Sequence, residues 1–207
     1  MKFIHFLALG TTLLTASLLQ AHSEAFAEDA SRAHIKAKHH EEGNLYIVTK
    51  GLLTLGDTYT EEATATEPEA QLKGRTGRGV GIDLGYRIGY GFAVELDFAY
   101  VHTDVKKRVE GEEEEMRAGA DYYSTGLDLL YGYHLNEAYV LFGKVGWEIE
   151  HEEISKYDIS GTDNGFAYAV GVEHAITEHW AFVGEYEDSL IDGPRGASLF
   201  AGASYTF

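Results

Sequence analysis

Nine isolated charged residues recur on the polar face of alternating segments, and their types permit ion pairing or the passage of cations. They are Asp83, Arg87, Glu95, Asp97, Asp128, Lys144, Glu148, Glu173 and Glu185. An unpaired charge is costly in an enclosed, low-dielectric space, so these side chains should pair with one another or hold water. Arg87 and Lys144 are the cations placed to neutralise the seven carboxylates. The set predicts an ion-paired network that closes a narrow interior, and its acidic excess leaves a cation-selective path as the alternative.

The composition of the chain excludes several other kinds of chemistry. With no cysteine among 207 residues, there is no disulfide, thiol nucleophile or cysteine-ligated metal. A net charge of -18 without a basic block argues against nucleic acid as a partner. The glycines alternate along strands and do not open helices, so no phosphate-binding loop and no cofactor are predicted. One polar segment contains imidazole and carboxylate groups that could bind a divalent metal weakly, but it is better interpreted as a solvated tail: His34, His39, His40, Glu41 and Glu42.

Period-two alternation of large apolar residues identifies the elements that would position the charges. Successive side chains of a strand point to opposite faces, so each segment has an apolar face and a face of glycine, alanine, serine and isolated charges. Seven segments show the pattern clearly: residues 80–88, 92–100, 123–133, 139–149, 166–173, 180–187 and 198–207. Residues 44–56 form an eighth, less regular strand whose register stays open.

Short and long connections alternate along the chain. Residues 89–91, 135–137 and 177–179 have the length of hairpin turns, whereas residues 57–75, 108–119, 151–164 and 188–196 are longer, polar and acidic. Eight strands with this alternation predict an all-β, eight-stranded antiparallel up-and-down transmembrane barrel. Its interior is just wide enough for side chains, so large apolar residues should face lipid, and small and charged residues should face inward. A secreted soluble barrel with its apolar face inward is the alternative.

The first 43 residues are predicted to lie outside the barrel. Residues 1–27 have a basic start, an apolar stretch and an Ala-Phe-Ala cleavage site, as in a secretory signal peptide. Cleavage after Ala27 and cleavage after Ala21 both remain open. Residues 28–43 are polar and lack any apolar repeat, so they are interpreted as a flexible leader. The barrel domain is therefore expected to span residues 44–207.

The combination of export signal, eight strands and final strand resembles a known family. Residues 44–207 are similar to the OmpA/OmpX-like superfamily of small Gram-negative outer-membrane β-barrel proteins. Gly202, Tyr205 and Phe207 are similar to the C-terminal signal that the barrel-assembly machinery reads. The resemblance implies a monomer in the outer membrane, with its termini in the periplasm and its long loops outside the cell. No peptidoglycan-binding domain is expected after Phe207, so a tethering role is not implied.

The predicted role is structural or surface-interacting, in the cell envelope, and non-enzymatic. A small cation-permeable, porin-like channel is the first alternative, and a lipid A-modifying enzyme is the second. The enzyme is disfavoured because no histidine of the barrel lies in a His-x-Ser-Asn pattern. Acidic connections, including the run from Glu112 to Glu115, would face anionic lipopolysaccharide. Divalent cations bridging these carboxylates to lipid phosphates are one hypothesis, and a simply solvated acidic surface is the other.

Overall fold

The computed structural model describes residues 43–61, 63, 68–109, 116–154, 156 and 159–207. The predicted signal peptide and the predicted leader, except Gly43, lie outside these residues, as does the acidic run 112–115. In the described ranges, no helix has the length and apolarity needed to cross a membrane.

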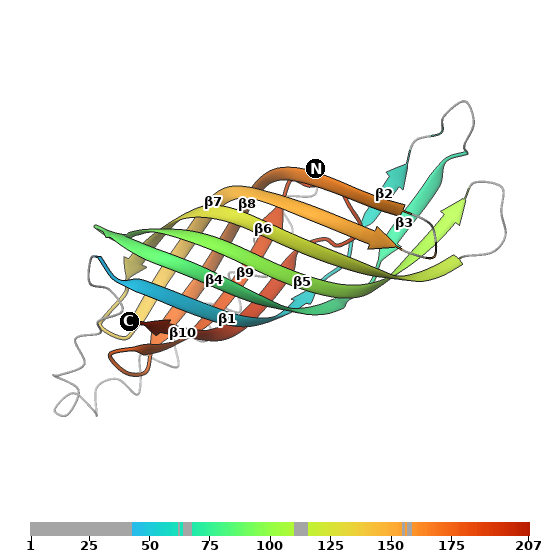
Figure 1. Cartoon of the computed structure of the whole chain (residues 1–207). Coiled ribbons are helices and arrows are strands. Elements are labelled where there is room, and N and C mark those ends of the chain that lie inside the picture. The colour runs from blue at the N-terminus through green and yellow to red at the C-terminus, as the bar shows by residue number, and fades with distance from the viewer. Residues whose placement is uncertain (1–42, 62, 64–67, 110–115, 155, 157–158) are drawn as a thin grey trace. The chain divides into compact units, whose positions relative to one another are not determined.

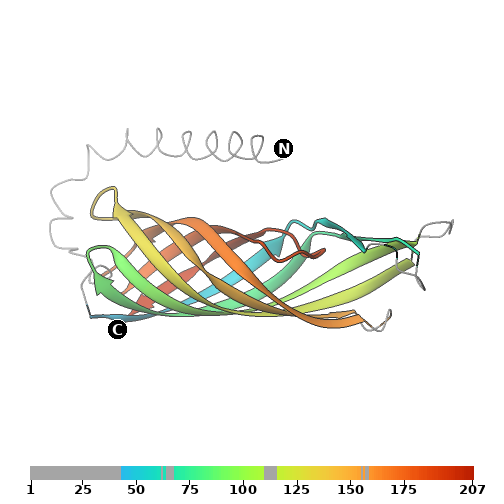
Figure 2. The same ribbon diagram turned by 90° about the horizontal axis from the view of Figure 1, so that it is seen from above.

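In the described ranges, ten antiparallel strands form one sheet, and eight of them close into a ring (Figure 1). The strands are β1 (Leu45–Thr54), β2 (Thr58–Glu61), β3 (Ala70–Gly74), β4 (Gly77–Gly89), β5 (Phe92–Val109), β6 (Met116–His134), β7 (Tyr139–Ile154), β8 (Ile159–Ala175), β9 (Trp180–Ser189) and β10 (Ser198–Thr206). The ring runs β1-β4-β5-β6-β7-β8-β9-β10 and closes through the pairing of β10 with β1. Figure 2 shows these strands tilted around a closed barrel. The predicted eight-stranded antiparallel barrel is confirmed.

The two ends of the barrel differ in their connections. At one end, called here the short-turn end, tight turns join β4 to β5, β6 to β7 and β8 to β9. The first turn uses Gly89, Tyr90 and Gly91, all with positive φ (117°, 55° and 85°), a conformation that glycine adopts without strain. Both ends of the ring meet there, because the Phe207 amide donates to the Leu45 carbonyl at 3.0 Å. The other end is called the long-connection end.

The long connections contain more strand than the sequence pattern indicates. The segment 57–75 holds the hairpin β2–β3, and β3 extends the sheet by pairing Ala70 with Val109 of β5. Most of the predicted connection 151–164 is likewise paired, with β7 and β8 continuing to Ile154 and Ile159. The apolar alternation fades here because the outward face of these strand ends is polar, while the backbone pairing continues. Buried apolar residues persist on the inward face, as at Val105, which is fully buried.

The outward face carries the large apolar side chains, as predicted from the alternation. Val80 is 63% exposed, Leu127 59% and Trp147 55%, although each is a hydrophobic residue in the middle of a strand. Aromatic rings contact one another at two levels of this face, as in the contacts of Tyr100 with Tyr123 (5.2 Å between centroids) and of Phe92 with Tyr131 (4.9 Å). An apolar outer band with aromatic girdles is typical of a barrel that spans a membrane.

The interior also contains large apolar residues, which the sequence analysis placed only on the outer face. They form two clusters that lie toward opposite ends of the barrel. Toward the long-connection end are Leu52, Leu72, Val101, Val105, Ala118, Ala120, Tyr122, Ile154 and Phe200. Toward the short-turn end are Tyr46, Val48, Ala93, Leu130, Phe142 and Val183. Asp83, Glu95, Lys144 and Glu185 lie between these clusters, so the interior is filled in layers.

Two inward glycines make room for the rings of the short-turn cluster. Gly85 lies directly opposite Tyr46, and a Cβ at Gly85 would approach the Tyr46 ring to 2.0 Å. Gly171 has the same relation to Phe142, whose Cζ would lie 2.2 Å from an added Cβ. Small residues on the polar face therefore allow aromatic rings from the neighbouring strand to lie flat against the inner wall.

Candidate functional site

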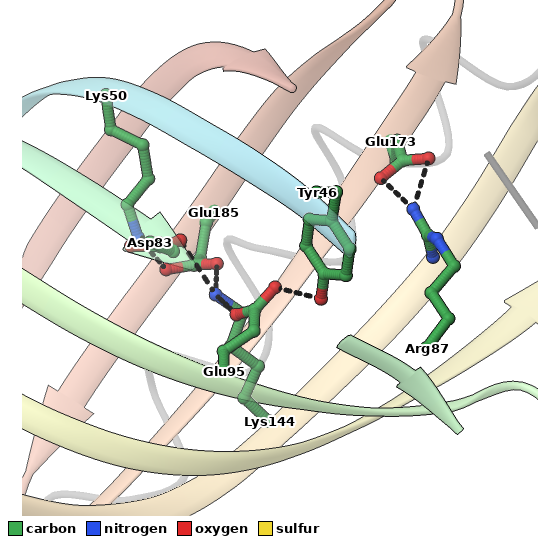
Figure 3. A network of polar contacts seen from close by, with 8 residues as sticks. All are labelled: Tyr46, Lys50, Asp83, Arg87, Glu95, Lys144, Glu173 and Glu185. Atoms are coloured by element: carbon green, nitrogen blue, oxygen red, sulfur yellow. Dashed lines mark hydrogen bonds and ion pairs between the residues drawn. The ribbon is translucent and has the colours of Figure 1, made fainter. Parts of the chain in front are cut away.

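A cluster of five charged side chains occupies the middle of the barrel interior and is called here the central cluster. It consists of Lys50, Asp83, Glu95, Lys144 and Glu185, contributed by β1, β4, β5, β7 and β9. Each of these side chains is at most 4% exposed. Because these five strands are distributed around the ring, the cluster connects opposite walls of the barrel (Figure 3).

Lys144 is the centre of this cluster. Its Nζ lies 2.5 Å from Glu95 Oε2, 2.7 Å from Glu185 Oε2 and 3.5 Å from Asp83 Oδ2. Lys50 is the second cation, with its Nζ 2.9 Å from Asp83 Oδ2 and 3.2 Å from Glu185 Oε1. Two ammonium groups thus share three carboxylates, which offsets the cost of placing charge in a low-dielectric interior.

Hydrogen bonds extend the network toward the short-turn end. The Tyr46 hydroxyl donates to Glu95 Oε1 at 2.5 Å, and the Arg87 guanidinium lies over the Tyr46 ring, 4.5 Å from its centroid. Arg87 Nη2 lies 3.4 Å from Glu173 Oε2 and 3.5 Å from Glu173 Oε1 (Figure 3). Beside these groups is a cavity of about 40 Å³, lined in part by Arg87, Phe142 and Glu173. A cavity of this size has room for at least one water molecule.

A separate group closes the interior toward the long-connection end. Arg195 Nη1 lies 3.0 Å from Glu148 Oε1, and Arg195 Nε lies 2.7 Å from Glu150 Oε2. The arginine comes from the connection between β9 and β10, which bends inward and leaves Arg195 only 5% exposed. Backbone hydrogen bonds hold this bend, since the Gly56 amide donates to the Arg195 carbonyl at 3.0 Å and the Asp57 amide to the Pro194 carbonyl at 3.0 Å.

Seven of the nine interior charges named from the sequence lie in ion pairs, namely Asp83, Arg87, Glu95, Lys144, Glu148, Glu173 and Glu185. Asp97 and Asp128 also point inward, but no ion pair joins either to another described residue. Each lies against a glycine of the next strand: a Cβ at Gly126 would be 2.3 Å from Asp97 Oδ2, and one at Gly146 would be 1.8 Å from Asp128 Oδ1.

Sequence reasoning missed two of the four interior cations of the described chain. Lys50 belongs to the strand whose register was left open, and that register places Tyr46, Val48 and Lys50 inward. Arg195 lies in a segment interpreted as a polar loop, and no periodic signal marks a loop that bends into a barrel. Even with these cations, carboxylates outnumber cations in the described interior, because Glu150 and Glu187 are also buried there.

The proposed assembly residues lie on the last strand and beside the aromatic girdle of the short-turn end. The Tyr205 ring contacts Trp180 at 4.9 Å and Phe207 at 5.2 Å between centroids. Gly202 lies opposite Lys50, where an added Cβ would approach the Thr49 carbonyl oxygen to 2.1 Å. Gly202 thus lies at the β1–β10 seam that closes the ring, and Tyr205 contacts the neighbouring β9. The recognition role of Gly202, Tyr205 and Phe207 stays a prediction.

A closed eight-stranded ring with a lipid-facing apolar band and an ion-paired interior defines a small outer-membrane β-barrel protein. Residues 11–207 match the sequence profile of the outer membrane protein beta-barrel domain. The chain belongs to this family, which confirms the resemblance to the OmpA/OmpX-like barrels and the location in the outer membrane.

Solved structures share the fold at low sequence identity. The outer membrane protein OprG from Pseudomonas aeruginosa is 13% identical to this chain, with a TM-score of 0.68. The match covers 83% of this chain and 99% of the OprG chain. Neisserial surface protein A (NspA) is 16% identical, with a TM-score of 0.54, covering 80% and 100%. Ail, the attachment invasion locus protein of Yersinia pestis, is 18% identical, with a TM-score of 0.50, covering 81% and 100%. No curated protein sequence matches the chain.

Proposed function

We propose that the protein is a closed, non-conducting and non-enzymatic scaffold of the outer membrane, whose interactions take place at its long-connection end. Short turns and chain ends face the periplasm in barrels of this class, and longer loops face the outside. The same placement here puts Leu45 and Phe207 in the periplasm and the β2–β3 hairpin outside the cell. The barrel is proposed to act as a monomer that stabilises the envelope or contacts partners at the surface.

The central cluster is the observation that carries this proposal. Lys144 contacts carboxylates of β4, β5 and β9 from β7, so its side chain and theirs occupy the cross-section of the barrel. A hydrated ion would have to break several buried ion pairs to pass, each costly to open in a low-dielectric interior. The Arg195 group and the two apolar clusters close further layers above and below.

Single-channel conductance of the refolded mature chain in a planar bilayer tests the proposal. We expect no steps from protein whose folding is shown by heat-dependent mobility on a detergent gel. Reproducible cation-selective steps that fall when Asp97→Asn or Asp128→Asn is introduced would overturn it. Asp104→Asn is the matched control, because this carboxylate is exposed and pairs with Arg75 outside the barrel interior.

A cation path is the second candidate, and the unpaired interior acids favour it. Asp97 lies opposite Asp83 on the neighbouring strand, and Asp128 lies opposite Glu95. Carboxylates on adjacent strands attract cations to an interior. The conductance measurement separates this candidate from the closed scaffold directly.

The histidines of the outer surface support a non-enzymatic function. His102 Nδ1 lies 2.8 Å from Asp121 Oδ1, which could orient the ring, but no hydroxyl group of the described chain bonds to this histidine. His151 Nδ1 lies 2.9 Å from Thr162 Oγ1, but no described carboxylate contacts that ring. Activation of a hydroxyl nucleophile needs a base that is itself oriented by a third group. Each pair supplies only part of that arrangement.

A further inference from the structure

Two carboxyl groups of the barrel interior stand outside its ion pairs, and they are called here the acid pair. The acid pair consists of Asp97 on β5 and Asp128 on β6. Asp128 is only 7% exposed, and no hydrogen bond or ion pair joins its carboxyl group to another described residue. Asp97 is partly buried, and its carboxyl group likewise lacks such a partner in the described chain. An unpartnered carboxylate is costly to bury, so the acid pair needs a source of neutralisation.

Both carboxyl groups lie against the backbone of the next strand, because a glycine stands opposite each of them. Asp97 is paired with Gly126, where an added Cβ would lie 2.3 Å from Asp97 Oδ2. Asp128 is paired with Gly146, where an added Cβ would lie 1.8 Å from Asp128 Oδ1. At this level β6 and β7 each have a paired strand on both sides, so their amides are used within the sheet. The backbone that the carboxyl groups touch therefore offers them no free donor.

The charged groups around the acid pair are mostly negative. Those that act on Asp97 come from four strands: Lys50 of β1, Asp83 of β4, Asp128 of β6 and Glu148 of β7. Those that act on Asp128 also come from four strands: Asp83 of β4, Glu95 of β5, Lys144 of β7 and Glu185 of β9. In each set, three carboxyl groups stand against one lysine. Like charges at short range destabilise an ionised carboxyl group.

The two lysines are already engaged by other groups. Lys144 directs its ammonium group at the three carboxylates of the central cluster (Figure 3), and an ammonium group has three N–H donors. Lys50 Nζ lies 2.9 Å and 3.2 Å from two of the same carboxylates and 4.3 Å from the centroid of the Phe200 ring. The central cluster and this ring thus use the lysine donors that the acid pair would need.

We propose that the acid pair is a proton-binding site, in which Asp97 and Asp128 are neutral carboxylic acids in the folded barrel at neutral pH. A protonated carboxyl group gains an O–H donor, and acceptors lie directly opposite, on Asp83 for Asp97 and on Glu95 for Asp128. A metal ion fits less well, because the described residues include no group of three or more histidines or carboxylates arranged to hold one.

The bound protons make the barrel interior sensitive to alkaline pH. When they are released, two negative charges appear beside the central cluster, whose lysines have no further donors for them. The packing of the interior should then loosen as pH rises. This property goes beyond the proposed closed scaffold, and it holds whether or not the lumen conducts ions.

Infrared spectroscopy of the refolded chain in lipid vesicles tests protonation directly, because a protonated carboxyl group and a carboxylate have separate carbonyl bands. At neutral pH we expect a carboxylic-acid band that weakens in Asp97→Asn and in Asp128→Asn and declines in wild type as pH is raised. Asp104→Asn is the matched control and should leave the band unchanged, because that exposed carboxylate is paired with Arg75. The proposal would be overturned by a wild-type spectrum without the band, or by an equal band in wild type and the double variant.

Urea unfolding supplies a second test with a defined sign. The unfolded chain releases an aspartate proton above about pH 3.9, and stability falls with rising pH wherever the folded state binds more protons than the unfolded state. Asp128→Asn resembles the neutral acid, so its urea midpoint should lie above that of wild type at neutral pH. The two midpoints should converge as pH falls below about 4, where both states of wild type are protonated.

Asp83→Asn is the contrasting variant of the same interior. It should lower the urea midpoint at neutral pH, because Asp83 contacts both lysines of the central cluster. An Asp128→Asn chain that is less stable than wild type at neutral pH would contradict the proposal. A marked fall of the wild-type midpoint with EDTA would contradict it too, since a bound divalent cation would then neutralise the acid pair.

Discussion

Lys144 of β7 and Glu95 of β5 meet inside the barrel with Nζ 2.5 Å from Oε2, although β6 separates their strands. On the intervening strand, Asp128 lies opposite Glu95 and Leu130 lies opposite Lys144, so the contact crosses the inner face of β6. Glu95 is also fixed by the Tyr46 hydroxyl, so the lysine meets a carboxylate that is already oriented. The pair therefore joins non-adjacent walls, which the backbone hydrogen bonds of the sheet do not do.

Replacing Lys144 should destabilise the barrel more than replacing any exposed cation. Lys144→Met leaves Lys50 as the cation at Asp83 and Glu185 and removes the ion pair of the buried Glu95. Removal of one partner of a buried ion pair costs about 3–5 kcal/mol. Lys73→Met on the exposed face is the matched control, with an expected change within about 0.5 kcal/mol. Urea unfolding in lipid vesicles, followed by tryptophan fluorescence, measures both. Equal urea midpoints for the two variants would contradict a contribution of the central cluster to the stability of the barrel.

The sequence predicts the strands and their inward and outward faces because burial in lipid imposes a strict alternation on them. At Asp83 and Lys144, that alternation alone assigns an interior position. It does not predict which charges meet, because partners such as Lys144 and Glu185 lie 41 residues apart and come together only when the ring closes. Lys50 was missed because β1 is rich in apolar residues on both faces.

Gly85→Ala should disturb the interior although it adds a single methyl group. The new Cβ would fall 2.0 Å from the Tyr46 ring, so the ring must move away and lose its hydrogen bond to Glu95. Overpacking of this kind costs about 1–3 kcal/mol. Gly161→Ala is the control, because nothing lies within 4 Å of its added Cβ. Urea midpoints of the two variants give the comparison, and a Gly85→Ala protein as stable as Gly161→Ala would show that the ring adjusts without cost.

Arg195→Gln should loosen the long-connection end and leave the short-turn end intact. The Arg195 side chain forms ion pairs with Glu148 and Glu150, and the Arg195 carbonyl accepts a hydrogen bond from the Gly56 amide. Local opening then exposes the Gly56 amide, and we expect its hydrogen exchange to accelerate by about tenfold or more. The Gly43 amide, which donates to the Arg87 carbonyl at the other end, is the internal control. Equal acceleration of exchange at both amides would indicate that the variant destabilises the whole barrel and that Arg195 does not stabilise the long-connection end locally.

The inward bend at Arg195 and the strand content of the long connections were beyond sequence reasoning for a common reason. Outside the lipid-facing band, the outward face of a strand meets water, so polar residues appear on it, and the pattern becomes that of a loop. What remains readable is the inward face, as in Val105 and Ile154 at the ends of β5 and β7. Such isolated apolar positions do not separate a short strand from a loop.

Asp121 gives the outer rim a stabilisation that depends on pH. It lies two residues beyond Tyr123 of the girdle, outside the apolar band, and hydrogen bonds from Tyr100 and His102 lower the pKa of its carboxyl below the ordinary value. A carboxyl whose pKa is lowered on folding stabilises the folded state above its unfolded pKa of about 3.9, and this contribution is lost as pH falls through the lower folded pKa. Because the Asp121 side chain is 35% exposed, the contribution should not exceed about 1 kcal/mol.

Asp121→Asn should therefore be less stable than wild type at pH 6, with the two stabilities converging as pH is lowered through the acid range. The free energy of unfolding in urea, measured at a series of pH values in lipid vesicles, gives the difference curve. Asp163→Asn, which removes an exposed carboxylate on β8, is the matched control. A gap between wild type and Asp121→Asn that stays constant down to the lowest pH would mean that the amide loses packing at this position and that the carboxylate charge contributes nothing.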